Sequence, residues 1–286
     1  MSEAREFALT APVYDRADVV VVGGGPAGVA ASIAAARSGR SVILLERSGQ
    51  LGGMATLGNV AIWMPVGNVT GIYREIVSEL LPGRLDGANP RKFAPLFDPM
   101  RLRHYLNGKL RAEGVKVVFH ADFVATARTD SRVVAVAVNT REGLRSVEGG
   151  IFVDCTGDGR VAIDAGAPHF AGREEDGMTQ PMTLMFQMQD TGKPVERNLP
   201  DDCPRYEKIQ DLPQGRHLFW ENKATGTLLV NMTRVKGNGA KIDEVNDAEV
   251  ESLRQVFGVA DYLQRNGFER YVLSTIGAQV GVRQTH

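Results

Sequence analysis

Residues 19–28 read Val-Val-Val-Val-Gly-Gly-Gly-Pro-Ala-Gly: an apolar run ends abruptly at a glycine turn, and a helix of small residues is predicted directly after it, from Ala27 to Ala36. Gly23, Gly25 and Gly28 have the G-x-G-x-x-G spacing of dinucleotide-binding turns. The first glycine allows the tight turn, the second lets backbone approach a pyrophosphate, and the third lets the helix lie close to the sheet. The pattern predicts a strand, a phosphate-binding turn and a helix.

A second apolar run, Val42–Leu45, ends at Glu46. An acid about 20 residues beyond the glycine turn is where a ribose hydroxyl finds its acceptor in dinucleotide-binding folds. Pro26 and Ala27 open the predicted helix, whose free N–H groups and positive dipole end favour an anion. The order of strand, turn, helix, strand and acid predicts a dinucleotide-binding βαβ unit. The alternative is a tight turn in an unrelated α/β protein.

The segment that follows the second strand distinguishes between dinucleotides. Residues 46–56 read Glu-Arg-Ser-Gly-Gln-Leu-Gly-Gly-Met-Ala-Thr. This stretch resembles the corresponding segment of FAD-dependent oxidoreductases of the glutathione-reductase-like class. The resemblance implies that Glu46 holds the adenosine ribose and that Gly52 and Gly53 bring backbone close to FAD. Neighbouring positions that it adds to the cofactor site are Arg47, Met54 and Thr56. The alternative is a plain surface loop.

Two further motifs resemble the same flavoproteins. Residues 153–159 read Val-Asp-Cys-Thr-Gly-Asp-Gly, and residues 180–186 read Gln-Pro-Met-Thr-Leu-Met-Phe. With Ala162–Pro168, they are similar to the subgroup related to the flavin subunits of heterodisulfide reductases. The resemblance spans nearly the whole chain and implies a Rossmann-like fold and FAD as cofactor. It places Gly157 and Asp158 beside the cofactor and the backbone of Val124 at the adenine, although Val124 also reads as an ordinary strand valine.

The chain departs from those relatives in two respects. It has 2 cysteines, Cys155 and Cys203, whereas a protein-held iron–sulfur cluster normally needs four thiolates. Relatives also continue beyond the segment that corresponds to residues 281–286 and cap the flavin with a further glycine-rich strand and helix. We therefore expect a fragment or a C-terminally shortened member that holds the flavin ring less well and catalyses poorly.

Composition limits the class of partner. The 286 residues carry a formal net charge of −1, with 43% hydrophobic residues, so neither nucleic acid nor an anionic membrane is indicated. Residues 1–17 lack a signal-peptide core and no apolar run approaches the length of a membrane span. These features predict a cytoplasmic protein that acts on a small-molecule substrate with a separate electron acceptor, and oligomers stay possible.

The expected architecture is α/β. It comprises a tail at residues 1–16, a Rossmann-like FAD-binding domain at 17–169 with a parallel sheet and an antiparallel meander, a smaller mixed α+β substrate domain at 170–275, and the start of a truncated return segment at 276–286. Helices are predicted at residues 71–81, 98–113, 161–165 and 243–266, beyond the first helix. Further strands are predicted at residues 115–119, 121–127, 132–138, 143–153, 182–188 and 227–232, and loops at 83–97 and 190–215.

The sequence does not identify the residues that carry out catalysis. The five histidines are scattered without metal-ligand spacing, and no catalytic triad is visible. His169, near the expected domain junction, is a candidate for substrate contact, although a lone histidine is more often structural or exposed. Arg283 resembles an arginine near the flavin in relatives. Trp63 and Met64 either line the flavin or pack in the core, and Cys155 behaves as a small hydrophobe. The catalytic residues are unknown.

The leading hypothesis is an FAD-dependent oxidoreductase in which a small-molecule substrate gives a hydride to flavin N5 and a second acceptor reoxidises the flavin. The first alternative is a catalytically silent protein that binds FAD or a nucleotide. A second alternative is an NAD-dependent enzyme without flavin, because the glycine turn alone does not separate NAD from FAD.

Overall fold

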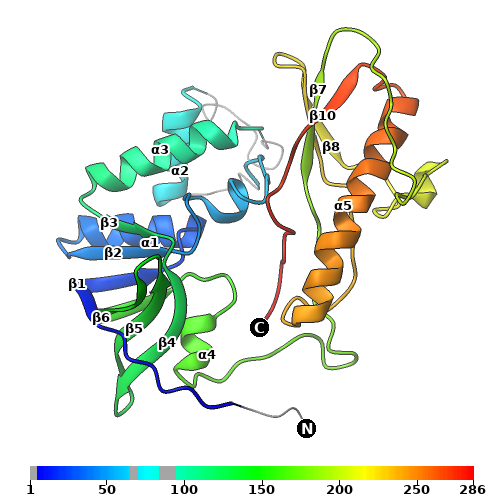
Figure 1. Ribbon diagram of the computed structural model, residues 1–286. Coiled ribbons are helices and arrows are strands. Elements are labelled where there is room, and N and C mark those ends of the chain that lie inside the picture. The colour runs from blue at the N-terminus through cyan, green and yellow to red at the C-terminus, as the bar shows by residue number, and fades with distance from the viewer. Residues whose placement is uncertain (1–4, 65–69, 84–94) are drawn as a thin grey trace. The chain divides into compact units, whose positions relative to one another are not determined.

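The computed structural model describes residues 5–64, 70–83 and 95–286 (Figure 1). The chain divides into two compact units, unit 1 with Met1–Leu51 and Tyr105–Pro168, and unit 2 with Gly52–His104 and His169–His286. In chain order the elements are β1 (Val13–Val22), α1 (Pro26–Arg37), β2 (Val42–Glu46), η1 (Gly53–Ala55), α2 (Gly71–Leu80), α3 (Pro99–Ala112), β3 (Lys116–Phe119), β4 (Asp122–Thr129), β5 (Arg132–Thr140), β6 (Gly143–Asp154), α4 (Arg160–Asp164), β7 (Phe186–Asp190), η2 (Ile209–Asp211), β8 (Phe219–Asn222), β9 (Thr227–Val230), α5 (Ile242–Arg265) and β10 (Tyr271–Ile276).

Unit 1 is built on a six-stranded sheet in the order β3-β2-β1-β6-β5-β4. β3, β2, β1 and β6 run parallel, whereas β6, β5 and β4 form an antiparallel meander. Parallel strands are usually buried on both faces and read as continuous apolar runs, and all five residues of β2 are buried. The parallel order brings the carboxyl ends of β2, β1 and β6 to the same edge of the sheet.

β6 joins the parallel sheet to the meander. Its first part pairs with β5 and its later part pairs with β1 up to Asp154. A Cβ on Gly149 would lie 2.8 Å from the Val20 side chain, so glycine permits the close crossing. A buried cluster joins Val20 and Leu45 of the parallel strands to Val136 and Val147 of the meander. Helix α1 contacts β1, β2 and β6 and therefore packs on the parallel part of this sheet.

Unit 2 contains a four-stranded antiparallel sheet in the order β10-β7-β9-β8. Helix α5 covers it and contributes Val256, Val259 and Leu263 to a core shared with Phe186 and Leu228 (Figure 1). All of these side chains are buried. The helix presents them on one face because apolar residues recur at helical spacing.

The mixed α/β class with parallel sheet and meander is confirmed, and several boundaries differ. β1 begins at Val13, inside the predicted tail 1–16, because its first residues pair with β6. In the predicted strand 182–188 the continuous ladder begins only at Phe186, and Met182 and Thr183 form isolated bridges. Asp98 caps α3, since its Oδ1 accepts a hydrogen bond from the Met100 N–H at 2.8 Å.

Two strands of unit 2, β8 and β10, have no counterpart among the predicted elements. The predicted FAD-binding domain 17–169 includes residues 52–104, but the described part of this range belongs to unit 2: Asn59 bonds with the Gln187 side chain at 2.8 Å, and Ala61 and Ile62 cluster with Met185. Most of the predicted loop 83–97 lies outside the described residues.

Candidate cofactor site

The three spaced glycines of unit 1 each have a distinct geometry. Gly23 has φ +107°, which disfavours any side chain, and a Cβ there would lie 2.2 Å from the Cys155 carbonyl oxygen. A Cβ on Gly28 would lie 1.7 Å from the Gly23 carbonyl oxygen. A Cβ on Gly25, by contrast, would meet no atom within 4 Å. Gly23 and Gly28 are therefore required by packing, whereas Gly25 leaves open space in front of the turn.

The N-terminus of α1 faces that open space. Gly25 is the N-cap residue and no side chain caps the helix. The first backbone bond of the helix runs from the Val29 N–H to the Gly25 carbonyl at 3.0 Å, and Pro26 and Ala27 are exposed. The first N–H groups of a helix lack intrahelical acceptors and carry the positive end of the dipole. This end can therefore receive an anion through backbone alone.

Glu46, at the end of β2, is tied to the glycine turn. Its side chain is buried. Oε2 accepts a hydrogen bond from the Gly24 N–H at 2.6 Å, and Oε1 accepts one from the Ser48 N–H at 2.7 Å. A carboxylate oxygen has room for more than one donor, so Glu46 holds the turn and still offers acceptor capacity.

The sequence pattern does not single out Gly24, although the structure requires a glycine there. A Cβ on Gly24 would lie 2.8 Å from Glu46 Oε2 and 2.8 Å from the Leu51 side chain. The bond between Glu46 and the turn therefore depends on the absence of a side chain at this position. The signal in the sequence is the run of three consecutive glycines, whose middle member lies outside the spaced motif.

The turn after β6 begins against the glycine turn. A Cβ on Gly23 would lie 3.0 Å from the Thr156 nitrogen, and the Cys155 N–H bonds with the Val22 carbonyl at 2.8 Å. Asp154 organises this turn: Oδ1 accepts from the Thr156 hydroxyl at 2.7 Å and Oδ2 accepts from the Ala162 N–H at 2.9 Å. Gly157 and Asp158 thus follow directly on a segment packed against Gly23.

Asp154 is a positioning residue that sequence reasoning missed, since its motif was interpreted through the residues that follow it. One oxygen of its carboxylate binds Thr156 at the start of the turn, and the other binds Ala162 in α4, which follows the turn. Cys155, the residue between Asp154 and Thr156, is half-buried. Burial raises the pKa of its thiol, and the neighbouring Asp154 carboxylate raises it further. A thiol that keeps its proton is a poor nucleophile, which agrees with the interpretation of Cys155 as a small hydrophobe.

Val124 lies on β4 at an irregularity of the ladder. Phe123 pairs with Val138 and Ala125 pairs with Ala137, so the register skips Val124. Its side chain is 36% exposed. A bulged residue is left out of regular pairing, which frees its backbone for another partner. Arg160 supports this strand, because its guanidinium donates to Asp122 at 2.9 Å and to the Phe123 carbonyl at 2.7 Å.

The Gly-Gly segment belongs to unit 2. Gly52 has φ +102°, and a Cβ there would lie 2.9 Å from the Thr56 hydroxyl oxygen. Gly53–Ala55 forms the 3-10 turn η1, and the Thr56 hydroxyl donates to the Gly53 carbonyl at 3.3 Å. Met54 reaches Gln279, whose amide lies 3.8 Å from the Met54 sulfur. Arg47, in unit 1, is exposed.

The remaining candidates also lie in unit 2. The His169 ring packs edge-on against His286 at 5.3 Å between centroids. Arg283 donates to the Thr183 hydroxyl at 3.4 Å. Trp63 packs against Phe97 at 4.7 Å between ring centroids. Its indole nitrogen is buried without a partner in the described part of the chain, whereas Met64 is exposed.

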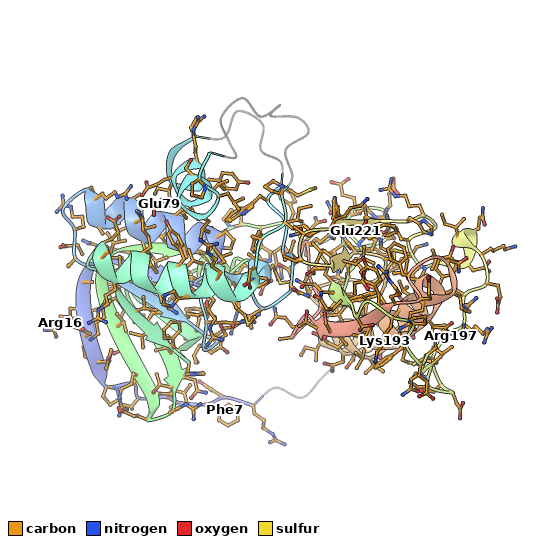
Figure 2. All side chains as sticks on the ribbon, turned by 90° about the horizontal axis from the view of Figure 1, so that it is seen from above. Phe7, Arg16, Glu79, Lys193, Arg197 and Glu221 are labelled. Atoms are coloured by element: carbon orange, nitrogen blue, oxygen red, sulfur yellow. The ribbon has the colours of Figure 1, made fainter. Side chains whose placement is uncertain are left out.

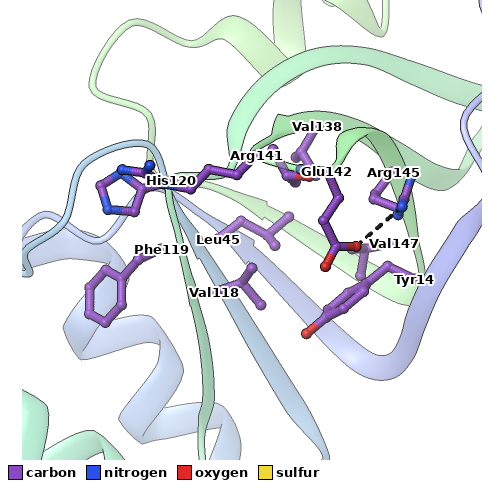
Figure 3. A pocket seen from close by; sticks show the side chains of 11 residues that line it. Tyr14, Leu45, Val118, Phe119, His120, Val138, Arg141, Glu142, Arg145 and Val147 are labelled. Atoms are coloured by element: carbon purple, nitrogen blue, oxygen red, sulfur yellow. Dashed lines mark hydrogen bonds and ion pairs between the residues drawn. The ribbon is translucent and has the colours of Figure 1, made fainter.

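A cavity of about 190 Å³ lies elsewhere in unit 1, between the parallel strands and the meander (Figure 3). Leu45, Val118 and Val147 form apolar lining, and the Glu142–Arg145 ion pair, 3.2 Å long, stands at its polar side. The residues that line it do not include Gly23–Gly28. The cavity is therefore separate from the glycine turn.

No helix in the described ranges 5–64, 70–83 and 95–286 is both long and apolar enough to cross a membrane. The same ranges hold no group of three or more His, Cys, Asp or Glu side chains arranged to bind a metal ion.

Comparisons with known structures agree on the fold. A geranylgeranyl bacteriochlorophyll reductase-like protein from Thermoplasma acidophilum aligns with a TM-score of 0.57 at 14% identity and covers 93% of this chain and 66% of that chain. The p-nitrophenol 4-monooxygenase PnpA from Pseudomonas putida DLL-E4 aligns with a TM-score of 0.57 at 13% identity and covers 92% of this chain and 67% of that chain. At these identities the likeness shows the fold alone.

Sequence comparisons add the family. The chain is 49% identical over 53 residues to a fumarate reductase (cytochrome) from Shewanella frigidimarina, a match that covers 18% of this chain and 9% of that protein. The chain thus spans less than a tenth of the length of that curated relative. A family model described as FAD dependent oxidoreductase matches residues 18–286. Since that match covers nearly the whole sequence, the chain belongs to the FAD dependent oxidoreductase family, and its cofactor is FAD.

Proposed function

We propose that this protein is an FAD-dependent oxidoreductase whose unit 1 binds the ADP half of FAD at the carboxyl edge of the parallel sheet. The observation that carries the proposal is the contrast among the spaced glycines. Gly23 and Gly28 are closed by backbone within 2.2 Å and 1.7 Å of an added Cβ, while Gly25 opens on free space. A pyrophosphate needs such a backbone cradle in front of an uncapped helix N-terminus.

Each residue around the cradle has a distinct role in this proposal. The backbone N–H groups of Gly25, Ala27 and Gly28 face the pyrophosphate, and Pro26, which has no N–H to donate, fixes the first turn of α1. Glu46 accepts from the adenosine ribose with the capacity that Gly24 and Ser48 leave free. The backbone of Val124, which the β-ladder skips, bonds with the adenine. These groups arise from two adjacent strand ends, those of β1 and β2, and one bulge in β4, all within unit 1.

The motifs at residues 46–56 and 153–159 supply further residues for the proposal. Gly157 and Asp158 follow the turn that packs on Gly23, and Arg47 follows Glu46. The resemblance at residues 46–56 adds Gly52, Gly53, Met54 and Thr56, around η1 in unit 2, to the residues proposed to bind the cofactor. The chemistry that bound FAD supplies is hydride acceptance and electron return, while the chain supplies binding, orientation and electrostatics.

The substrate is a small molecule whose identity the family does not fix. We further propose that the chain belongs to the glutathione-reductase-like group, close to heterodisulfide reductase flavin subunits, on the motifs at residues 46–56, 153–159 and 180–186. The division into an FAD-binding domain at 17–169, a substrate domain at 170–275 and a return segment at 276–286 belongs to the same proposal. A separate electron acceptor and a cytoplasmic location stay predictions.

The test is FAD binding by a matched pair of glycine variants. Gly25→Val places a side chain in the open space before the turn, and Gly108→Val adds the same side chain at an exposed site on α3 where a Cβ would also meet nothing within 4 Å. We expect G25V to raise the FAD Kd about a hundredfold, which corresponds to about 2.7 kcal/mol, with G108V close to wild type. Equal affinity in the two variants would contradict the site.

The same samples separate the alternatives. Flavin absorbance that bleaches with a reductant and returns with a dye acceptor supports an oxidoreductase. Bound FAD that no member of a substrate panel reduces supports the silent FAD-binding protein. Saturable binding of NADH without FAD binding supports the NAD-dependent enzyme.

A further inference from the structure

The arginines of residues 169–286, all of which the structure describes, fall into two groups. This stretch contains nine arginines. Six of them form ion pairs with Asp or Glu side chains: Arg173, Arg197, Arg205, Arg254, Arg265 and Arg270. Arg197, labelled in Figure 2, is one example and reaches Asp261 at 3.9 Å. The other three, Arg216, Arg234 and Arg283, have no acidic partner among the described residues.

These three arginines lie on adjacent segments of unit 2. The Asn231 N–H bonds with the Leu218 carbonyl at 2.9 Å, so the segment that carries Arg216 continues the β8–β9 pairing alongside the segment that carries Arg234. Val235 bridges to Met182, and the next residue, Thr183, bridges to Gly281. Arg234 and Arg283 therefore flank the same short segment from opposite sides.

The surrounding structure fixes the positions of two of the guanidinium groups. Arg234 donates to the Gln214 side chain, and Gln255 holds its backbone by accepting from the N–H at 2.8 Å and donating to the carbonyl at 3.3 Å. Arg283 donates to the Thr183 hydroxyl at 3.4 Å. The exposed Arg216 makes no hydrogen bond or ion pair to any described residue.

The three positive charges in this cluster repel one another. Burial lowers the pKa of the half-buried Arg234, and the positive charges of Arg283 and Arg216 lower it further. The other six arginines of residues 169–286 are each neutralised by an acidic partner. Three cations gathered without a counter-charge destabilise the fold unless a ligand neutralises them. Guanidinium groups bind carboxylate and phosphate in a bidentate geometry.

We propose that Arg216, Arg234 and Arg283, the arginine cluster of unit 2, bind an anionic group of the substrate, a carboxylate or a phosphate. The proposal rests on the proposed oxidoreductase function for the identification of the bound anion as substrate. It narrows the substrate class to small molecules that carry such a group. Binding of the anion itself depends only on unit 2, and it is measurable without flavin.

The experiment titrates the full chain with two probes, sodium succinate and inorganic phosphate, at constant ionic strength set with sodium chloride. The two tryptophans, Trp63 and Trp220, both lie in unit 2, and Trp220 lies four residues from Arg216, so tryptophan fluorescence reports the binding. We expect saturable binding of at least one probe, with a Kd raised about tenfold or more in R216Q. Arg205→Gln, which removes an exposed arginine paired with Glu207, is the control and keeps the wild-type Kd.

Arg216 is the position to change because it bonds with no described residue, so its loss leaves the fold intact. Arg234→Lys is the second variant: it keeps the charge but loses the planar fork, and we expect weaker binding than wild type. Tighter binding of succinate identifies a carboxylate, and tighter binding of phosphate identifies a phosphate. Absence of saturable binding, or equal Kd values in wild type and R216Q, overturns the proposal.

The outcome is separable from that of the proposed function. Anion binding that depends on Arg216 in a chain that holds no FAD supports the cluster and contradicts the oxidoreductase. FAD binding that depends on Gly25, combined with an unchanged anion Kd in R216Q, supports the cofactor site and overturns the arginine cluster.

Discussion

The glycine turn of unit 1 and the arginine cluster of unit 2 are two ways to build an anion site. The turn occupies six consecutive residues, Gly23–Gly28, and offers backbone N–H groups and the end of a helix. The cluster takes its charges from Arg216, Arg234 and Arg283, on segments that only the second sheet and its extensions bring together. The first site depends on glycines, whose missing side chains leave the backbone free to bind, and the second depends on charged side chains.

This difference has a thermodynamic consequence. In the turn, the atoms proposed to bind the ligand also pack the sheet, since Gly23 and Gly28 touch backbone that any Cβ would displace. Stability and binding are therefore linked there, except at Gly25. In the cluster, the guanidinium groups repel one another, so binding is gained at some cost to stability. Four experiments separate the two designs.

The largest effect is expected from Gly28→Ala. An added Cβ would lie 1.7 Å from the Gly23 carbonyl oxygen, so α1 must move away from the sheet. We expect a loss of about 3 kcal/mol or more in the free energy of unfolding. Urea denaturation followed by circular dichroism measures it.

Gly25→Ala is the matched control for this prediction, because its Cβ would meet nothing within 4 Å. It should unfold within about 0.5 kcal/mol of wild type. Similar losses in the two variants would show that the spaced glycines share one structural role, and the distinction between packing glycines and an open glycine would fail.

The same contrast explains what the sequence predicts and what it does not. Strand β2, helix α1 and the meander were predictable because each is a contiguous run with its own period or glycine stop. The site residues Gly23, Gly25 and Gly28 follow from spacing alone. Gly24 and Asp154 did not, because their roles depend on Glu46 and Ala162, which lie 22 and 8 residues away.

Unit 2 was less predictable because its elements depend on distant pairing. Only Tyr271 of β10 is buried, so the strand lacks an apolar alternation. β8 is a four-residue strand without a buried residue. The arginine cluster joins positions up to 67 residues apart, from Arg216 to Arg283, and nothing in the sequence between them marks the association.

A pH titration tests whether the stability of unit 2 depends on the protonation of the buried Tyr206. Burial raises the pKa of Tyr206 to about 12, assisted by Glu251. Because the folded-state pKa lies above the ordinary value of about 10, the neutral phenol stabilises the fold fully below pH 10, and this contribution is lost as the pH rises from about 10 to 12. We expect a loss of about 2–3 kcal/mol across that window.

Urea unfolding at a series of pH values, followed by tryptophan fluorescence, reports unit 2 because it holds both tryptophans. Tyr206→Phe keeps the ring and removes the titrating group. The variant should lose less stability than wild type between pH 10 and 12. Parallel pH profiles for the two proteins would show that Tyr206 makes no such contribution.

Glu46 has two roles that can be separated by experiment: it stabilises the glycine turn, and it is proposed to bind the ribose. Its carboxylate already accepts from Gly24 and Ser48, so Glu46→Ala lowers stability whether or not it binds ribose. The role of Glu46 in ribose binding is tested by comparing the affinities for ADP and 2′-deoxy-ADP. Wild type should bind ADP about tenfold more tightly than 2′-deoxy-ADP, about 1.4 kcal/mol, and E46A should lose that preference. Glu148→Ala, which removes a half-buried acid on β6 that pairs with Arg16, is the control and should keep that preference.

The smallest expected effect has the opposite sign and tests the design of unit 2 directly. Arg216 bonds with no described residue and adds positive charge beside Arg234. In low salt without a probe anion, R216Q should therefore be more stable than wild type, by up to about 0.5 kcal/mol, the scale of one exposed like-charge contact. The gain should shrink as salt screens the repulsion. Arg205→Gln, which breaks an ion pair, should give no gain. A stability loss in R216Q that is independent of salt would mean that Arg216 supports the fold, and the two units would then not differ in how their sites relate to stability.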